Sequence, residues 1–343
     1  MDIFRRNFCM NSGKYKLKID PIPVLISSGN PAVIYFTRRD ILAEKVGPIN
    51  DLWQLPIVLK ILKKQQESGS WKYPGNIRRD VRSRENYDQL ETFRILGELI
   101  EKYDLNKTHP QIQEAAEYLF SCQTSEGDFR GIYGNQYATT YSPAIMELLI
   151  KAGYENDKRI KMGFKWLLKM RQDDGGWVIP LRTSGMNLKE ALKDNRLTLP
   201  DRSKPFSHLV TGMVLRAFAA HPEYREYEEA KYAGTLLASR FFLPDKYPDR
   251  KDKKFWEGVS FPFWFTNIVT ALDSLSFLKF TTDSQDIQRG LMFLSNRQNN
   301  KGLFDLKILK GSDKDLKYWI CLAICRLFVK YGIMNLENGK QKI

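Results

Sequence analysis

The segment CQTSEGDF, residues 122–129, marks the point where one kind of helix gives way to another. The stretch before it is amphipathic, with apolar residues recurring every three or four positions, which predicts a helix at the surface. The stretch after it, Ala144–Ile150, is more apolar. Because a helix that is apolar nearly all round must be covered on every side, the segment predicts a hairpin with an outer and an inner helix.

The same pattern, a glutamine followed after two or three residues by Gly, any residue and an aromatic, occurs four times. The copies are Gln65–Trp71, Gln123–Phe129, Gln172–Trp177 and Gln298–Phe304. A further hairpin at 226–278 has lost the Gln and the Gly, and Trp256 only loosely fills the aromatic position. Repeats of this kind decide the architecture of a chain.

Counting the apolar and amphipathic stretches gives about six hairpins. Inner helices are predicted near 31–45, 86–102, 137–152, 206–220, 261–278 and 314–331. Outer helices are predicted near 51–66, 110–123, 158–171, 226–240 and 284–297, with 22–27 as a short sixth. We therefore predict an all-α fold, an (α/α)6 toroid closed by the two chain ends. The long connections 173–205 and 242–260 are predicted to cover one rim or to carry function.

The composition predicts a folded protein, because 43% of the 343 residues are hydrophobic and 27% are charged. No linker rich in Gly, Ser or Pro divides the repeats. We predict a basic N-terminal extension at 1–20, one toroid domain at 21–335 and a polar tail at 336–343.

The formal net charge is +14, and the basic residues are dispersed outside the N-terminal extension. Dispersed charge argues against a nucleic-acid groove, so no nucleic acid is expected, whereas the basic extension leaves peripheral contact with an anionic membrane open. The sequence shows no signal peptide and no long apolar span, and its four cysteines are irregularly spaced. These features predict a cytoplasmic protein with free thiols.

The repeated motif resembles the QW repeat of squalene and hopene cyclases and of protein prenyltransferase beta subunits. Residues 122–129, continuing to Tyr141, Pro143 and Ala144, look like a prenyltransferase repeat, and Gln172–Trp177 looks like a cyclase one. The resemblance covers about residues 30–331. Residues 30–40 also resemble the opening of uncharacterised single-domain prenyltransferase-like proteins, a group with no reaction to carry over.

The resemblance implies a toroid in which each Gln reaches the N-terminus of the next inner helix and satisfies backbone donors there. The Gln residues and the aromatics are therefore predicted to be structural staples, and Asp173 and Asp174 share their loop. Two features of the known enzymes are missing from this chain. The Asp-x-Asp-Asp acid of the cyclases occurs nowhere, and no Cys and His converge visibly as zinc ligands, so we expect no metal and no cofactor.

In such a ring the N-terminal ends of the inner helices converge on one mouth, where aromatic side chains suit an elongated apolar ligand. Each residue has ordinary core packing as its alternative. The predicted ligand-binding residues are Tyr35, Arg39, Tyr87, Tyr137, Tyr141, Phe206, Phe263, Trp264, Asn267 and Trp319.

The catalytic residues are unknown from the sequence, with Asp88 and His208 as candidates. Asp88 has a favourable first-turn charge as its alternative role, and His208 has a hydrogen-bonded core position. Arg38 and Arg39, with four arginines between 78 and 84, could clamp a diphosphate or could be solvated charges.

The first functional hypothesis is a terpenoid-cyclase-like or prenyltransferase-like toroid that binds an isoprenoid or other long apolar ligand in an aromatic central cavity. Whether it is an enzyme stays open; an enzyme would have a terpene cyclase-like or prenyl-transferring activity with non-standard catalytic residues. The alternative is a noncatalytic helical repeat scaffold for a protein partner. A third reading, sugar cleavage, would need two carboxylates across the lumen, with Asp88 and Glu257 as the pair.

Overall fold

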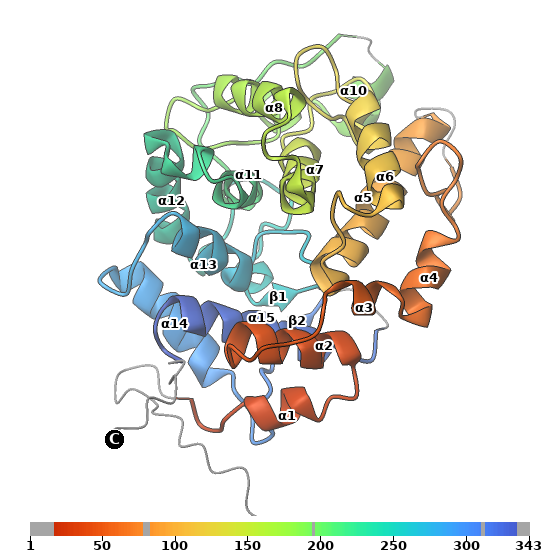
Figure 1. Cartoon of the computed structure of the whole chain (residues 1–343). Coiled ribbons are helices and arrows are strands. Elements are labelled where there is room, and N and C mark those ends of the chain that lie inside the picture. The colour runs from red at the N-terminus through yellow and green to blue at the C-terminus, as the bar shows by residue number, and fades with distance from the viewer. Residues whose placement is uncertain (1–16, 78–82, 194–195, 310–312, 335–343) are drawn as a thin grey trace, which may run out of the picture.

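The computed structural model describes residues 17–77, 83–193, 196–309 and 313–334. Most of the basic extension, the polar tail and three of the arginines between 78 and 84 lie outside these ranges. Figure 1 looks roughly along the axis of a ring of helices, with one set of helices around the centre and a second set outside it. The predicted all-α toroid is therefore confirmed.

Six helices form the inner set. They are α2 (Pro31–Phe36), α5 (Arg84–Tyr103), α7 (Tyr141–Leu149), α11 (His208–Ala220), α13 (Ile268–Phe277) and α15 (Leu316–Lys330). Two of them continue into π-helical turns, η1 (Thr37–Ile41) after α2 and η3 (Ile150–Tyr154) after α7.

The outer set alternates with the inner one along the chain. It comprises α1 (Ile22–Ile26), α3 (Asn50–Trp53) with α4 (Pro56–Leu62), α6 (Pro110–Ser121), α8 (Lys158–Lys169), α12 (Glu228–Ser239) and α14 (Gln285–Asn296). The connections hold α9 (Pro180–Thr183), α10 (Leu188–Lys193), η2 (Gly131–Tyr133), η4 (Tyr224–Glu226) and η5 (Lys253–Trp256). Two short strands, β1 (Gly258–Val259) and β2 (Lys307–Ile308), pair in parallel.

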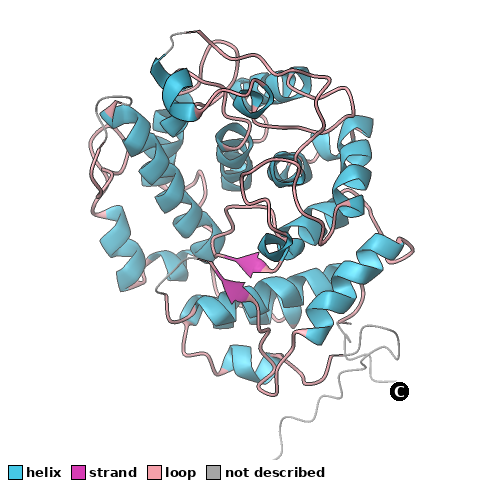
Figure 2. Ribbon diagram, turned by 180° about the vertical axis from the view of Figure 1, so that it is seen from behind, coloured by secondary structure: helices cyan, strands magenta, loops and turns pink. Residues whose placement is uncertain are grey.

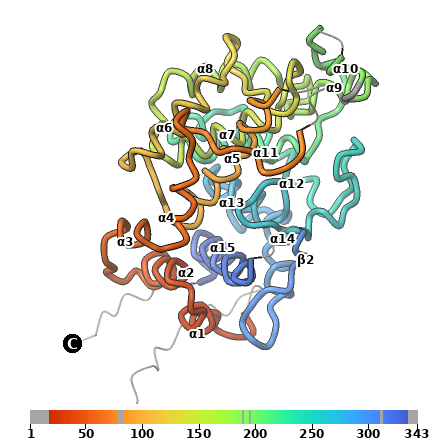
Figure 3. The backbone as a smooth tube through the Cα atoms, turned by 90° about the vertical axis from the view of Figure 1, so that its right-hand side faces the viewer, coloured from red at the N-terminus to blue at the C-terminus, as the bar shows by residue number. Residues whose placement is uncertain are grey.

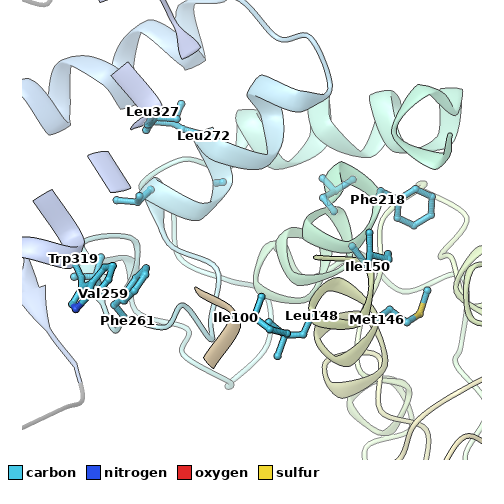
Figure 4. Close-up of a cluster of buried hydrophobic side chains, with 14 of the residues drawn as sticks. Ile100, Met146, Leu148, Ile150, Phe218, Val259, Phe261, Leu272, Trp319 and Leu327 are labelled. Atoms are coloured by element: carbon cyan, nitrogen blue, oxygen red, sulfur yellow. The ribbon is translucent and has the colours of Figure 1, made fainter. Parts of the chain in front are cut away.

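Burial separates the two sets as the sequence pattern predicts. All nine residues of α7 are buried, whereas α8 buries only one face, which includes Ile160, Phe164 and Leu167. The buried side chains of the inner helices form a continuous apolar core, part of which is shown in Figure 4. Within the described ranges, no helix has the length and apolar character needed to cross a membrane.

Gln65 and Gln123 join successive outer helices, whereas Gln172 Nε2 donates to the carbonyls of Asp201 and Lys204 in the connection 173–205. The Nε2 of Gln123 donates to the carbonyl of Gly127 in its own loop and to the carbonyl of Arg159 in α8, both at 2.8 Å. Gln65 makes the same pair of contacts, with Gly69 and with Gln111 in α6. The sequence predicted that each Gln satisfies backbone donors of the next inner helix, and this prediction was wrong for Gln65 and Gln123. Their side-chain amides donate to backbone carbonyls of the next outer helix.

Glycine is required in this loop for two reasons. Gly127 has φ +104°, a conformation that residues with a side chain rarely adopt. A Cβ at this position would also lie only 2.6 Å from the carbonyl oxygen of Met162 in α8. The loop and the next outer helix therefore touch backbone to backbone.

The aromatic position of the staple makes the link to the inner helix. The backbone N–H of Trp71, Phe129 and Trp177 donates at 2.9 Å to a hydroxyl on the following inner helix. The acceptors are Thr92 in α5, Ser142 in α7 and Thr211 in α11. One short motif therefore fixes an inner and an outer helix at once.

The indole rings of the staples turn back toward the preceding outer helix. The Nε1 atoms of Trp71 and Trp177 donate to the carbonyls of Ile61 and Leu167, each ten residues earlier. In the degenerate repeat, Trp256 Nε1 donates to the Leu243 carbonyl at 2.9 Å. Leu243 lies after the end of α12 (Glu228–Ser239), so the indole of the divergent hairpin bonds to the following connection and not to the outer helix.

The last staple closes the ring. Gln298 Nε2 donates to the carbonyl of Ile19 at 2.7 Å, and its Oε1 accepts from the backbone N–H groups of Lys18 and Ile19. A second closing contact joins Asn30 Nδ2 to Asp315 at 2.8 Å. Figures 1 and 3 show α2 lying beside α15 as a result.

Two predicted helices differ from the structure. The outer helix expected at 51–66 breaks into α3 and α4, because Leu55 precedes Pro56 and adopts ψ 137°. The inner helix expected at 261–278 begins only at Ile268, and the seven residues before it are not helical.

We predict that Gln298→Ala opens the ring closure specifically. The change removes three hydrogen bonds to residues 18 and 19 and should lower the free energy of unfolding by about 1–3 kcal/mol. In hydrogen exchange, the amides of Lys18 and Ile19 should lose their protection. Gln123→Ala is the matched control, since it cuts the same contacts between consecutive repeats and should leave those two amides protected.

Candidate functional site

The segment Phe261–Thr266 occupies the middle of the ring. Figure 2 shows the chain after β1 running across the inside of the helices. Phe261 stacks on Trp319 of α15 with ring centroids 5.4 Å apart, and Thr266 Oγ1 donates to the carbonyl of Leu209 in α11. Figure 4 shows Phe261 against Trp319. The chain itself therefore fills part of the inside of the ring.

Four aromatic rings meet where this segment reaches α5 and α7. Trp264 lies 4.8 Å from Phe93 and 5.0 Å from Tyr141, measured between ring centroids, and Tyr133 lies 5.7 Å from Tyr141. We call Phe93, Tyr133, Tyr141 and Trp264 the inner aromatic cluster. Tyr141 is buried, whereas the other three are only partly buried. The cluster is therefore not completely enclosed by the residues around it.

The inward face of α5 shows the order of chemical groups along this site. Gln89, Phe93, Gly97 and Glu101 follow one another at intervals of four residues and so lie on one face of the helix. Gln89 lies near Tyr141, Phe93 belongs to the cluster, and a Cβ at Gly97 would contact Pro262. Glu101 pairs with Lys151 at 2.6 Å. The face therefore runs from an amide through aromatic rings to a charged pair.

A buried ion network lies beyond the cluster, between α5, α7 and α11. Glu147 accepts from Arg216 Nε at 2.9 Å and from Lys151 Nζ at 2.7 Å. Burial alone would raise the pKa of Glu147, but the two cations outweigh this effect and lower it. Arg216 Nη1 also donates to the carbonyl of Trp264 at 3.3 Å, which ties the central segment to the network.

The two long connections meet beside the cluster. Arg182 of α9, in the connection 173–205, pairs with Asp249 of the connection 242–260, with Nη2 and Oδ1 2.6 Å apart. The guanidinium of Arg250 lies 3.6 Å from the centroid of Phe265, the ring next to Trp264 in the chain. Figure 3 places both connections on one side of the ring.

The structure brings several predicted ligand-binding residues together through the central segment. Tyr141 and Trp264 are in direct contact. Phe263 and Trp319 join them less directly, because both pack against Phe261.

The other predicted residues lie elsewhere. Tyr35 donates to the carbonyl of Gly47, Arg39 pairs with Asp40 and Asp104, and Tyr87 packs on Tyr73. Tyr137 donates to Glu126, Phe206 packs over Gly176, and Asn267 caps the N-terminus of α13. Each of these side chains makes a local structural contact.

The two catalytic candidates also make structural contacts. Asp88 accepts from the backbone N–H of Tyr73 at 2.8 Å and lies 3.7 Å from Arg84. His208 Nδ1 lies 3.3 Å from Asp245 without the geometry of a hydrogen bond, and its ring stacks on Trp256 at 4.6 Å. Burial lowers the pKa of His208 to about 4, although Asp245 opposes the shift.

The remaining charged candidates do not converge on the cluster. Glu257 pairs with Arg297 at 2.7 Å, and Arg38 is half exposed near Glu44. Among the arginines proposed as a diphosphate clamp, Arg78, Arg79 and Arg82 lie outside the described residues, as does the carboxylate Asp80. Within the described residues, no group of three or more His, Cys, Asp and Glu side chains could hold a metal ion.

Residues 89–186 match the family model of the squalene-hopene cyclase C-terminal domain. The matched stretch covers α5 to α9 and contains three of the four cluster rings, those of Phe93, Tyr133 and Tyr141. Over these residues the chain resembles a terpenoid cyclase domain. The resemblance predicted from the repeats is thereby confirmed.

Several solved structures contain chains similar to this one, and three of them are a protein from Actinoplanes, a polysaccharide lyase and a terpene cyclase. A protein from Actinoplanes is 14% identical with a TM-score of 0.44, covering 83% of this chain and 88% of that one. A polysaccharide lyase is 13% identical with a TM-score of 0.45, covering 82% and 86%. The type II terpene cyclase MstE from Scytonema, in its apo form, is 13% identical with a TM-score of 0.34, covering 84% and 98%. The assignment above rests on the family model and on the repeats.

Sequence reasoning missed several residues of this candidate site. Phe93 and Tyr133 were overlooked because neither lies at the start of a predicted inner helix. The sequence did contain a signal that could have predicted the ion network. Glu147 and Arg216 are the single charged residues in two otherwise apolar inner stretches, and buried charges must be paired.

We predict that His208 makes stability depend on pH. Its folded pKa of about 4 lies below the ordinary value of 6.5, so the unfolded chain binds more protons between these values. The free energy of unfolding should therefore rise with pH from about 4 to 6.5, by up to about 3 kcal/mol from this residue. His208→Gln should flatten the profile measured by urea unfolding, and a profile unchanged from wild type would refute the assignment. His109→Gln is the control, because His109 is only partly buried and should change the profile less.

Proposed function

We propose that this protein binds an isoprenoid or other long apolar molecule at the inner aromatic cluster. The observation that carries the proposal is the convergence of Phe93, Tyr133, Tyr141 and Trp264 from three separate parts of the chain, with all but Tyr141 only partly buried. Large apolar surface at a converging site is typical of a small-molecule site. The match to a squalene-hopene cyclase domain over this region supports the same class of ligand.

The arrangement favours a ligand with carbon–carbon double bonds. Aromatic pairs gain free energy from offset or edge-to-face contact, and the cluster presents rings at interplanar angles between 52° and 77°. A flexible polyene can follow such differently tilted rings. The charged side chains of the ion network around Glu147 lie beyond Gly97 and mark the end of the apolar part of the site.

The protein binds this ligand without cyclising it. Proton-initiated cyclisation needs a strong acid held among the rings, and the sequence has no Asp-x-Asp-Asp string. The nearby carboxylates of α5 are engaged. Asp88 holds the Tyr73 amide, and Glu91 forms a two-point pair with Arg94 at 2.5 and 2.9 Å.

We expect wild-type protein to retain geranylgeraniol in equilibrium dialysis, and Trp264→Ala to bind it at least about tenfold more weakly. The loss reflects the apolar ring area removed from the site, worth about 1.5–3 kcal/mol. Tyr232→Ala is the control, since Tyr232 is an aromatic residue 56% exposed on the outer helix α12. Equal losses in both variants, or no retention by wild type, would contradict the proposal.

We also expect no cyclic product when purified protein is offered squalene or geranylgeranyl diphosphate. The reason is the lack of a free acid in the family position. Gas chromatography with mass spectrometry checks this directly. A cyclic terpene that disappears in Asp88→Asn would show that an acid outside the family pattern delivers the proton.

A further inference from the structure

Arg250 carries a guanidinium group that has no polar partner in the described part of the chain. Among the arginines that the structure describes, it is the one whose guanidinium makes neither a hydrogen bond nor an ion pair. Arg159 also lies over an aromatic ring, 3.7 Å from the centroid of Phe120, but it pairs with Glu117 and Asp157. Arg250 is only partly buried, and each of its side-chain nitrogens keeps exposed surface. Its hydrogen-bond donors are therefore open to the surroundings of the protein.

Two aromatic rings and a closed turn hold this guanidinium in place. Its Cζ lies 3.6 Å from the ring centroid of Phe265 and 4.9 Å from that of Phe255. Arg250 has φ +49°, a left-handed conformation that costs free energy for most residues other than glycine. The backbone N–H of Asp245 donates to the carbonyl of Lys251 at 2.9 Å and closes the turn. The side chain is therefore ordered in advance, which lowers the entropic cost of binding to it.

Arg250 supplies one positive charge that no carboxylate compensates. The neighbouring Asp249 forms a two-point pair with Arg182 instead. Burial lowers the pKa of Arg250, and no charged group of the described chain contributes to this shift. A single guanidinium matches a carboxylate in charge and in its two-oxygen geometry. A diphosphate would keep most of its negative charge unpaired at this place.

The guanidinium is connected to the inner aromatic cluster through one further ring. The ring of Phe265 lies 5.5 Å from that of Trp264, measured between centroids, at an interplanar angle of 72°. Trp264 in turn contacts Phe93 and Tyr141. Both Phe265 and Trp264 are only partly buried. A positive group and a series of apolar rings therefore follow one another without a break.

We propose that Arg250 binds the carboxylate of an amphipathic ligand whose apolar chain lies against the inner aromatic cluster. The preferred ligand is then a long-chain acid, such as an isoprenoid carboxylic acid, and not the corresponding alcohol or hydrocarbon. This inference rests on the proposed function, because it assigns the charged end of a ligand whose chain occupies the same site. Charge-assisted hydrogen bonds to a carboxylate are about twice as strong as neutral ones, so the headgroup contributes to selectivity as well as affinity.

The decisive experiment compares farnesoic acid with farnesol, which share a carbon skeleton and differ in the charge of the end group. Affinities are measured near neutral pH by equilibrium dialysis for wild type, Arg250→Gln and Arg250→Lys. We expect wild type to prefer the acid, and Arg250→Gln to lower the ratio of acid affinity to alcohol affinity by at least about tenfold. Arg250→Lys should keep part of the preference, because it retains the charge but not the planar fork.

Arg289→Gln is the matched control. It removes the same charge from the outer helix α14, where Arg289 pairs with Asp286 at 2.8 Å, and should leave the ratio of affinities unchanged. Because Arg250→Gln breaks no hydrogen bond and no ion pair of the described chain, its urea midpoint should stay close to that of wild type. A marked fall in that midpoint with an unaltered ratio would show that Arg250 only stabilises the fold and would overturn the inference.

The outcomes separate this inference from the function on which it rests. Wild type that binds neither ligand would refute the proposed function and the inference together. Wild type that binds both ligands, with a ratio that Arg250→Gln does not alter, would leave the aromatic site standing and refute the role of Arg250. Farnesyl phosphate that binds more tightly than farnesoic acid, with an advantage that Arg250→Gln removes, would overturn the assignment of a carboxylate.

Discussion

The structure depends on one repeated hydrogen-bonded contact, in which a glutamine amide holds its own glycine loop and the next outer helix. The aromatic residue that ends the motif adds the contact to the inner helix, through its backbone N–H. A hairpin of this kind cannot bury its apolar inner helix alone, so each repeat needs its neighbours. Because Gln298 makes the same contact with residues 18 and 19, the last repeat meets the first and the ring closes.

Inside this ring, neighbouring inner helices are also joined by charge. The pairs are Lys151–Glu101, Arg216–Glu147, Lys330–Asp273, Arg326–Asp40 and Arg39–Asp104. Arg216–Glu147 is buried and the other pairs are partly exposed. Such pairs contribute little net stability, because lost hydration offsets the attraction in a buried pair and solvent screens it in an exposed one. We infer that their main effect is to specify which helices are neighbours, since a misplaced helix would leave a charge unpaired.

The central segment connects this architecture with the site. Its carbonyl at Trp264 accepts from Arg216, and its rings pack on α5, α7 and α15. The terpenoid cyclase-like fold therefore encloses part of its own chain, and the inner aromatic cluster lies where that segment meets α5 and α7. The surface of the cluster is built from both helices and a loop, so its shape depends on the whole ring.

The sequence by itself determined the architecture, because helix periodicity and the Gln-Gly-aromatic motif are local signals that repeat. It also predicted Tyr141 and Trp264 as ligand-binding residues, from their position just before or at an inner helix, and the structure brings their two rings into contact. Only the tertiary structure decided which aromatic rings meet, since Phe93 and Trp264 are far apart in the chain and their contact depends on ring closure. The same holds for His208, whose neighbours Asp245 and Trp256 come from another connection.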